Sequence, residues 1–190
     1  KNSRHQWCLV SIEDKWYHLD ATWDDRDDDE SHIAYMYFNV TDSFITVDHT
    51  LAKRYTILSQ EELDGANEAD GTIMFNLPLP QCNSEDSSFI NKAGAVINAL
   101  DDNDTYDNAV SKLRDAALRK DSCFYVSISP NLDFDKTVKS LFQEYPQEFF
   151  QYVADVNRSI DTDYKISDDN LSISASKEHR IVAVNLKYTN

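Results

Sequence analysis

The chain has 190 residues and a formal net charge of −16 at pH 7, and 12% of its residues are aromatic. The acidic balance opposes binding to nucleic acid and to anionic membrane surfaces, because both require cationic side chains. The aromatic content is typical of a packed globular chain, and no apolar run approaches the length of a membrane-spanning helix.

The first predicted element is a β-hairpin. Val10–Ile12 and Lys15–Tyr17 are strand-like runs, and Glu13-Asp14 between them can form a two-residue loop although it lacks the usual Gly. Such a loop places Ile12 opposite Lys15, which fixes the register of the whole hairpin.

Counting back along both strands places four chemically distinctive side chains on one face: Trp7 opposite Asp20, and His5 opposite Thr22. His5 and Asp20 are then diagonal neighbours, roughly 7–8 Å apart at their Cβ atoms, so their side chains can lean together. An imidazole oriented by a carboxylate is two-thirds of a nucleophilic triad.

These residues resemble the transglutaminase-like superfamily of cysteine acyl-transfer enzymes, which have a papain-like fold. The shared pattern is a His-x-Trp strand at residues 5–7, a short turn, and Trp-Tyr-His-x-Asp-x-Thr-Trp at residues 16–23. The resemblance continues through Tyr37–Asp42 and Asp48–Thr50 and covers roughly the first fifty residues, which is more specific than a lone short motif. Two positions depart from it: Cys8 stands where Asn is common, and Asp14 replaces a turn Gly.

The resemblance implies that His5 is the general base and that Asp20 orients it. It also implies that four flanking residues support the site or bind substrate: Trp7, Trp16, Thr22 and Trp23. The reaction would use a thiolate to hydrolyse a peptide or amide bond, or to pass the acyl group to an amine. The substrate would be a protein or peptide, either free or linked to a cell-wall polymer, and neither a cofactor nor a metal is expected.

In this family the nucleophilic Cys precedes the His in sequence. We therefore expect the chain to be the C-terminal part of a longer protein whose N-terminal remainder is its partner in the site, and we expect the chain alone to be inactive. Cys8 and Cys123 are predicted to be buried or inert thiols, and Cys82 lies in a Pro-flanked loop, where it could pair with Cys123. Similar proteins with a small appended domain are bacterial secreted or envelope proteins, although the sequence leaves a cytoplasmic location open.

Two other interpretations of the hairpin remain open. The chain could be a non-catalytic transglutaminase-like module that binds a peptide or cell-wall polymer, or His5 and Asp20 could form an ordinary hydrogen bond. The three Trp residues could likewise form a hydrophobic mini-core rather than a dry, aromatic site.

Further predicted strands are Ile33–Val40 and Tyr55–Leu58. The acidic run Asp24–Glu30 lacks the Gly and the ligand spacing of a calcium loop, which favours a solvated loop. The composition divides the chain into a transglutaminase-like part over residues 1–58, a linker or long excursion over 59–88, and a small α+β domain over 89–190.

The last part is predicted to contain three helices. Thr105 would cap a helix over Tyr106–Lys120, and Asp133 or Asp135 would cap one over Thr137–Tyr145. Pro146 would start the third, Gln147–Ser159, which would bury Phe149, Phe150 and Val153.

Three strands complete this part: Phe124–Ile128, Leu171–Ser174 and Ile181–Tyr188. The last two alternate apolar and polar residues, which predicts a half-buried hairpin around Lys177-Glu178. The sequence therefore predicts an α+β protein: the antiparallel sheet of a transglutaminase-like domain, followed by helices on one face of a small antiparallel sheet. His179, beside the turn, is predicted to be a surface residue.

Overall fold

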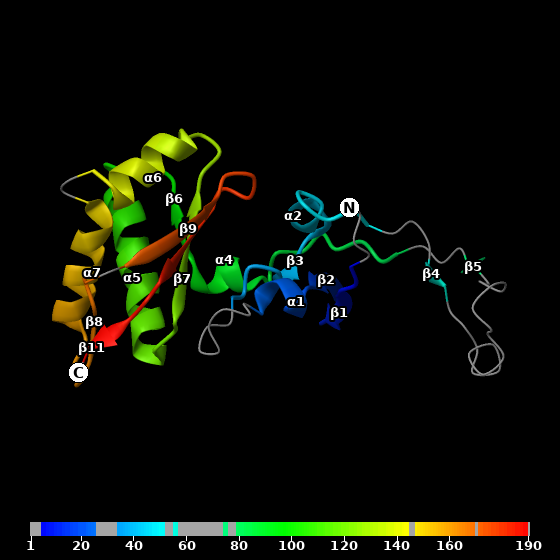
Figure 1. Ribbon diagram of the computed structural model, residues 1–190, viewed down its shortest axis with the longest axis horizontal. Coiled ribbons are helices and arrows are strands. Elements are labelled where there is room, and N and C mark those ends of the chain that lie inside the picture. Colours follow the sequence, from blue (N-terminus) through cyan, green and yellow to red (C-terminus); the bar gives the residue numbers. More distant parts are fainter. Residues whose placement is uncertain are drawn as a thin grey trace.

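Two separate β-sheets organise the chain (Figure 1). The computed structural model describes residues 5–25, 34–51, 55–56, 74–75, 79–144, 147–169 and 171–189. One sheet has the strand order β1-β2-β3 and the other the order β6-β7-β10-β9, and β4-β5 and β8-β11 form two further short pairs. Together with the helices these sheets make an α+β protein, as the sequence predicts.

The strands are β1 (Cys8–Ile12), β2 (Lys15–Leu19), β3 (Phe38–Val40), β4 (Tyr55–Thr56), β5 (Met74–Phe75), β6 (Ala95–Ile97), β7 (Cys123–Ile128), β8 (Lys165–Ile166), β9 (Ser172–Ser176), β10 (Ile181–Asn185) and β11 (Tyr188–Thr189). The helices are α1 (Ala21–Asp24), α2 (Asp42–Ile45), α4 (Phe89–Ala93), α5 (Asn103–Arg119), α6 (Phe134–Phe142) and α7 (Glu148–Ser159).

The N-terminal hairpin has the predicted register. Ile12 pairs with Lys15 and the antiparallel ladder runs back to Cys8 opposite Leu19. Glu13 and Asp14 form the turn with φ values of 50° and 61°, so both adopt the left-handed conformation that a two-residue hairpin loop requires.

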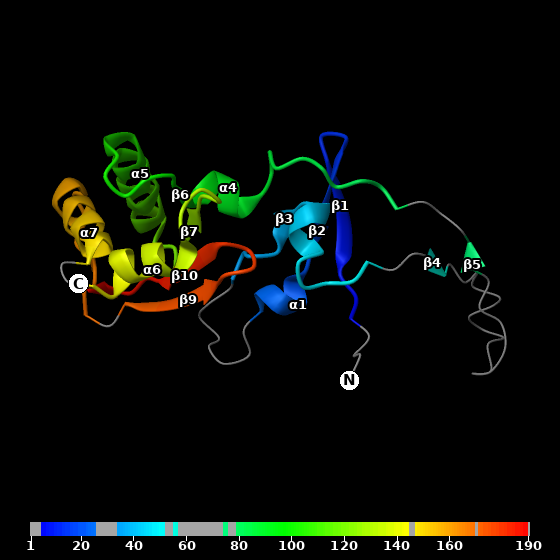
Figure 2. The ribbon, with the colours of Figure 1, turned by 90° about the horizontal axis from the view of Figure 1, so that it is seen from above.

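The hairpin is held on its open edge and at its turn by other segments. Strand β3 pairs with β2, so only the end of the predicted Ile33–Val40 strand is extended. Residues 81–88 run past the hairpin (Figure 2), where Ser84 accepts a hydrogen bond from the Tyr17 hydroxyl at 3.2 Å and Asp86 pairs with Lys15.

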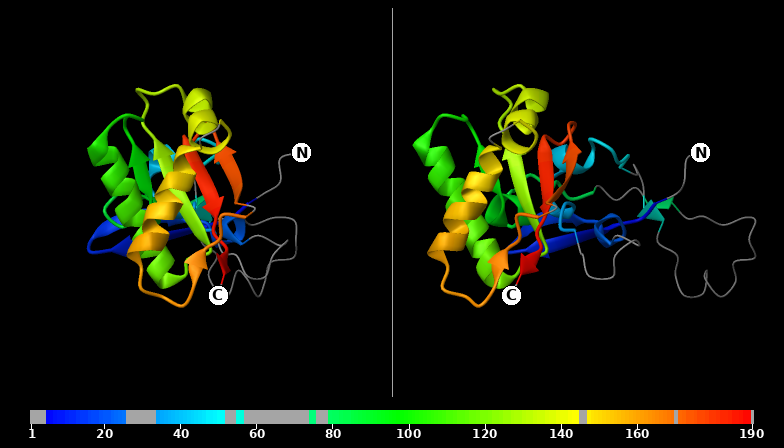
Figure 3. Two further views of the ribbon diagram at one scale, coloured as in Figure 1. Left: turned by 90° about the vertical axis from the view of Figure 1, so that its left-hand side faces the viewer. Right: turned by 60° about the vertical axis from the view of Figure 1, so that its left-hand side comes forward.

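The second sheet is covered on both faces. Helices α5, α6 and α7 lie on one side of the strands (Figure 3), and their apolar side chains form the main core with residues such as Phe124, Val126 and Val182. On the other side, Tyr125, Ile181 and Ala183 pack against residues of the N-terminal half and α4: Tyr35, Met36, Phe44, Phe89 and Ile90.

The expectation that the final hairpin is half-buried is wrong for β10, because the second sheet is covered on both faces. The first four residues of β10 are all buried, because helices cover one face and the N-terminal half covers the other. The turn around Lys177-Glu178 forms as predicted, but β10 ends at Asn185 and β11 follows separately. The sheet is also mixed rather than antiparallel, since β6 runs parallel to β7.

The three predicted helices form with adjusted ends. The cap of α5 is Asp102, whose carboxylate accepts from the Thr105 backbone at 2.9 Å, so Thr105 lies in the first turn and is not the cap. Asp133 caps α6 in preference to Asp135, and α6 ends at Phe142.

Helix α7 follows Gln147 and buries two of the three predicted side chains, Phe149 and Val153, whereas Phe150 stays partly exposed. Pro146 lies outside the described residues.

Candidate functional site

The predicted contact between His5 and Asp20 is confirmed. His5 Nε2 pairs with Asp20 Oδ2, and the His5 side chain is 24% exposed whereas the Asp20 side chain is fully buried. Because the carboxylate occupies Nε2, the ring nitrogen left for a reacting group is Nδ1. The pair thus joins a fully buried carboxylate to a partly exposed imidazole.

Asp20 is fixed by a change of secondary structure that the sequence analysis did not foresee. Strand β2 ends at Leu19, and Asp20 Oδ1 accepts hydrogen bonds from the backbone N–H groups of Thr22 at 3.1 Å and Trp23 at 3.2 Å as the cap of α1. The placement of Thr22 opposite His5 on a strand is therefore wrong: Thr22 is exposed on a helical turn and contributes its backbone. Asp is a strong N-cap residue, so this signal was present in the sequence.

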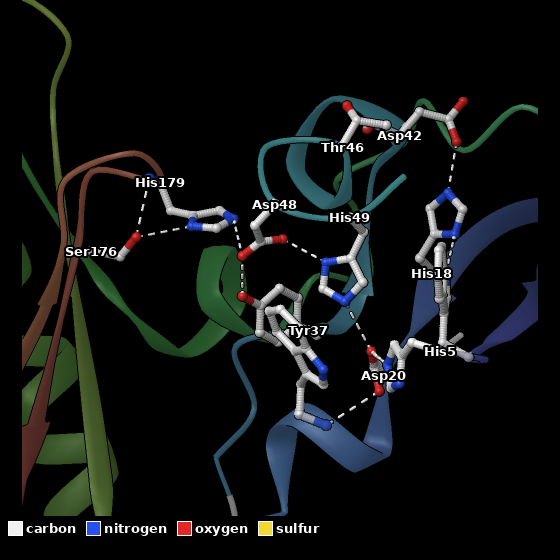
Figure 4. Close-up of polar contacts among 12 residues, drawn as sticks. His5, His18, Asp20, Tyr37, Asp42, Thr46, Asp48, His49, Ser176 and His179 are labelled. Atoms are coloured by element: carbon white, nitrogen blue, oxygen red, sulfur yellow. Dashed lines mark hydrogen bonds and ion pairs between the residues drawn. The ribbon is translucent and has the colours of Figure 1, made fainter. Parts of the chain in front are cut away.

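A second histidine, His49, lies in the loop after α2 and contacts the same Asp20 carboxylate. Its Nε2 lies 3.0 Å from Asp20 Oδ2 and its Nδ1 lies 2.5 Å from Asp48 Oδ1 (Figure 4). The His49 side chain is 2% exposed, so a buried imidazole stands between two carboxylates. The sequence offered Asp48–Thr50 only as an extension of the family resemblance.

These contacts leave the Asp20 carboxyl ionised. Burial raises the pKa of Asp20, but hydrogen bonds from His5, from His49 and from the Trp23 backbone outweigh it and hold that pKa below its usual range. The site therefore contains a buried negative charge beside two imidazoles.

Asp48 links this cluster to the C-terminal half. It accepts a hydrogen bond from the Tyr37 hydroxyl at 2.5 Å, and its Oδ2 lies 3.6 Å from His179 Nε2. Burial and this hydrogen bond raise the pKa of Tyr37, so the phenol stays protonated and donates. The prediction of His179 as a surface residue is wrong: its side chain is 2% exposed, and its Nδ1 lies 2.9 Å from Ser176 Oγ.

Aromatic rings wall the His5 imidazole. Trp7 stacks on it at 5.9 Å between ring centroids, and Trp23 lies 5.7 Å away and also contacts His49 at 4.2 Å. Trp23 is 46% exposed, so this wall is open to solvent on one side. Trp16 is 40% exposed and lines a separate surface depression with Asp86, so it does not join the ring wall around His5.

A second His–Asp pair, His18 with Asp42, lies next to Trp7. His18 Nε2 contacts Asp42 Oδ1 at 2.7 Å, and the Cys82 sulfur lies close to both. Trp7 Nε1 donates to His18 Nδ1 at 3.0 Å, which fixes the tautomer with hydrogen on Nε2. Burial, followed by the negative charge of Asp42, raises the pKa of Cys82 to about 12, so this thiol stays protonated and is a poor nucleophile.

The thiols predicted to be buried or inert differ in exposure. Cys8, the first residue of β1, is exposed rather than buried, and Cys123 is partly buried at the start of β7. None of the three cysteines forms a disulfide, so the possible pairing of Cys82 with Cys123 does not occur.

The acidic run Asp24–Glu30 lies mostly outside the described residues. Its first residue is not solvated as expected: Asp24 is buried and accepts a hydrogen bond from the Tyr37 backbone at 2.9 Å.

Comparison of the chain with models of known protein families and with curated proteins gives no match. Among the helices of the described segments, none has the length and apolar character needed to cross a membrane.

Proposed function

We propose that this chain supplies the general base and its orienting carboxylate to a transglutaminase-like, thiol-dependent acyl-transfer site. The observation that carries the proposal is the His5–Asp20 pair: a buried carboxylate, capped by backbone N–H groups, holds Nε2 of a histidine that is open to solvent. His49 reinforces this arrangement, because it donates to the same carboxylate oxygen from the other side.

In the proposed mechanism His5 Nδ1 takes the proton of a cysteine thiol, and the thiolate attacks an amide carbonyl carbon. Collapse of the tetrahedral intermediate breaks the C–N bond, and His5 returns the proton to the leaving amine. Water or a second amine then attacks the thioester, giving a carboxylic acid or a new amide and restoring the thiol. Throughout, Asp20 keeps the imidazole in one tautomer and stabilises its protonated form.

The nucleophilic thiol in this scheme comes from outside the 190 residues. Cys8 is exposed at the start of β1, Cys82 lies with His18 and Asp42, and Cys123 belongs to the second sheet. The chain alone is therefore proposed to be inactive.

The proposal is tested on protein expressed from its complete coding sequence, assayed for hydrolysis of a peptide amide and for incorporation of a fluorescent amine. His5→Ala should abolish both. Asp20→Asn should keep the fold and lower turnover, by analogy with the serine-protease triad, on the order of 10⁴-fold. Cys8→Ser is the matched control and should keep full activity, because this thiol is exposed on β1 and has no part in the proposed mechanism.

Thermal melts of the same variants separate catalysis from folding. If Asp20→Asn and His5→Ala lowered only the melting temperature and left turnover unchanged, both residues would be structural. A protein that retained a peptide or wall polymer without cleaving it would instead be the non-catalytic binding module.

A further inference from the structure

Three ligand atoms of the kind that bind transition metals converge on one point. One ligand atom from each of His5, Asp20 and His49 lies within 4.8 Å of the others, and the two Nε2 atoms both contact Asp20 Oδ2. They come from three segments: the residues before β1, the cap of α1 and the loop after α2 (Figure 4). Two imidazoles thus address the same oxygen of one buried carboxylate.

The surroundings of these atoms match those of a metal site. Asp20 Oδ1 is held by two backbone N–H groups, so Oδ2 alone is directed at the imidazoles. His49 Nδ1 contacts Asp48, and a carboxylate on the distal nitrogen is the usual outer partner of a metal-bound histidine. His5 is partly exposed, which leaves one side of the cluster open to water.

We propose that these three residues form a binding site for a zinc-class divalent transition-metal ion, with His5 Nε2, Asp20 Oδ2 and His49 Nε2 as ligands and water in the fourth position. Two imidazoles and one carboxylate with an open position are a common zinc donor set. Mg²⁺ and Ca²⁺ prefer oxygen ligands and bind such a site poorly. This inference goes beyond the expectation of no metal drawn from the sequence.

The second cluster, His18 with Asp42 and Cys82, has similar residues but is not a metal site. The Trp7 indole N–H occupies the lone pair of His18 Nδ1, so Nε2 carries the hydrogen. A metal at Nε2 would require a doubly deprotonated imidazole beside a carboxylate. The His18 cluster therefore serves as a negative control for zinc binding at the His5 cluster.

The proposed metal binding does not rest on the proposed acyl transfer, but a bound metal would affect that reaction. The ion would take the Nε2 atom that Asp20 otherwise holds, so a bound metal and a working His5–Asp20 pair exclude each other. Zinc should therefore inhibit the proposed reaction, and the binding measurement stands even if no reaction is found.

The test is calorimetric titration of the chain with Zn²⁺ in excess Mg²⁺, which occupies the many surface carboxylates. A Cys8→Ser background removes the exposed thiol. The expected result is one tight site, with visible absorption bands of tetrahedral Co²⁺ when cobalt replaces zinc. His49→Gln and Asp20→Asn should each abolish this site. Asp48→Asn should weaken it by about 10–100-fold, as the loss of an outer partner does.

His18→Gln is the matched control, since it changes a buried histidine of the other cluster and should leave zinc affinity unchanged. In the Cys8→Ser chain, zinc should also shift the imidazole nitrogen resonances of His5 and His49 in NMR and leave those of His18 in place, a readout that needs no histidine or aspartate variant. Unchanged zinc affinity in both His49→Gln and Asp20→Asn would overturn the proposal, as would a zinc-induced shift at His18 alone.

Discussion

At the residue scale, the Asp20 carboxylate makes hydrogen bonds with four groups: two backbone N–H groups and two imidazoles. Oδ1 caps a helix and Oδ2 meets two imidazoles, so the side chain has no contact with solvent. Removing its charge leaves the cap possible but deprives His5 and His49 of their shared anion. Asp20→Asn therefore separates the electrostatic role from the structural one.

The stability of the protein should fall with acid partly through Asp20. Hydrogen bonds hold the pKa of Asp20 below its usual range in the folded state, so its contribution is present above about pH 4, the ordinary value, and is lost as pH falls through the lower folded pKa. Asp20→Asn should lower the free energy of unfolding at pH 7 and flatten its decline below pH 4. Urea denaturation at several pH values measures both, and parallel curves for the two proteins would contradict the expectation.

The thiols should react at very different rates. Cys8 is exposed, whereas Cys82 is buried and its pKa is raised to about 12. Because the thiolate is the reacting form, a disulfide reagent should modify Cys8 quickly in the native protein and Cys82 only after unfolding. Labelling followed by peptide mass mapping, with and without urea, checks this order. Modification of Cys82 at the rate of Cys8 would show that the loop carrying it opens readily.

At the element scale, the hairpin was predictable because a two-residue turn fixes the register of both strands. Pairing of Ile12 with Lys15 alone placed His5 and Asp20 on one face. The prediction failed beyond Leu19, where the capping preference of Asp20 ends the strand and removes Thr22 from that face. Local capping prevailed over continued strand pairing.

The turn of this hairpin offers a stabilising substitution. Asp14 has a φ of 61°, a conformation that costs most residues with a side chain about 1–2 kcal/mol, aspartate less than that, and glycine almost nothing. Asp14→Gly should raise the free energy of unfolding by about 0.5–1 kcal/mol after the larger unfolded-state entropy of glycine is subtracted. Urea denaturation measures the change.

Arg180 is the contrasting position, with a φ of 57° but a side chain that donates to three backbone carbonyls, those of Ile128, Ser129 and Leu132. Arg180→Gly should therefore destabilise the protein. Equal gains at the two positions would mean that backbone strain alone controls both.

At the scale of the whole molecule, the two halves meet across one face of the second sheet. This contact could not be predicted, because no sequence pattern pairs Tyr35 with Tyr125 or Asp48 with His179 across such distances along the chain. His49 was missed for a related reason: its position depends on how the loop after α2 returns to Asp20. The sequence therefore identified the His5–Asp20 pair and the flanking Trp7 and Trp23, but not the contacts of His49, Asp48 and His179 around them.

The contact between the halves should be measurable through Tyr125. Its buried hydroxyl accepts a hydrogen bond from the Tyr35 backbone N–H at 2.9 Å. Tyr125→Phe leaves that N–H without its acceptor and should cost about 1–3 kcal/mol in the free energy of unfolding. Tyr164→Phe, which removes a hydroxyl in a more exposed contact at 3.3 Å, should cost less than about 0.5 kcal/mol. Equal losses in both variants would mean that the hydrogen bond between Tyr125 and Tyr35 stabilises the protein no more than the exposed contact of Tyr164 does.

The sheet face shared by the two halves also determines which fragments of the chain would remain soluble when expressed alone. Tyr125, Ile181 and Ala183 point toward the N-terminal half, and Tyr35, Met36 and Phe44 cover them. A fragment beginning at residue 89 would carry this apolar patch into water, where such patches promote self-association. Mutations that loosen Tyr35, Met36 or Phe44 from the second sheet should therefore appear first as aggregation.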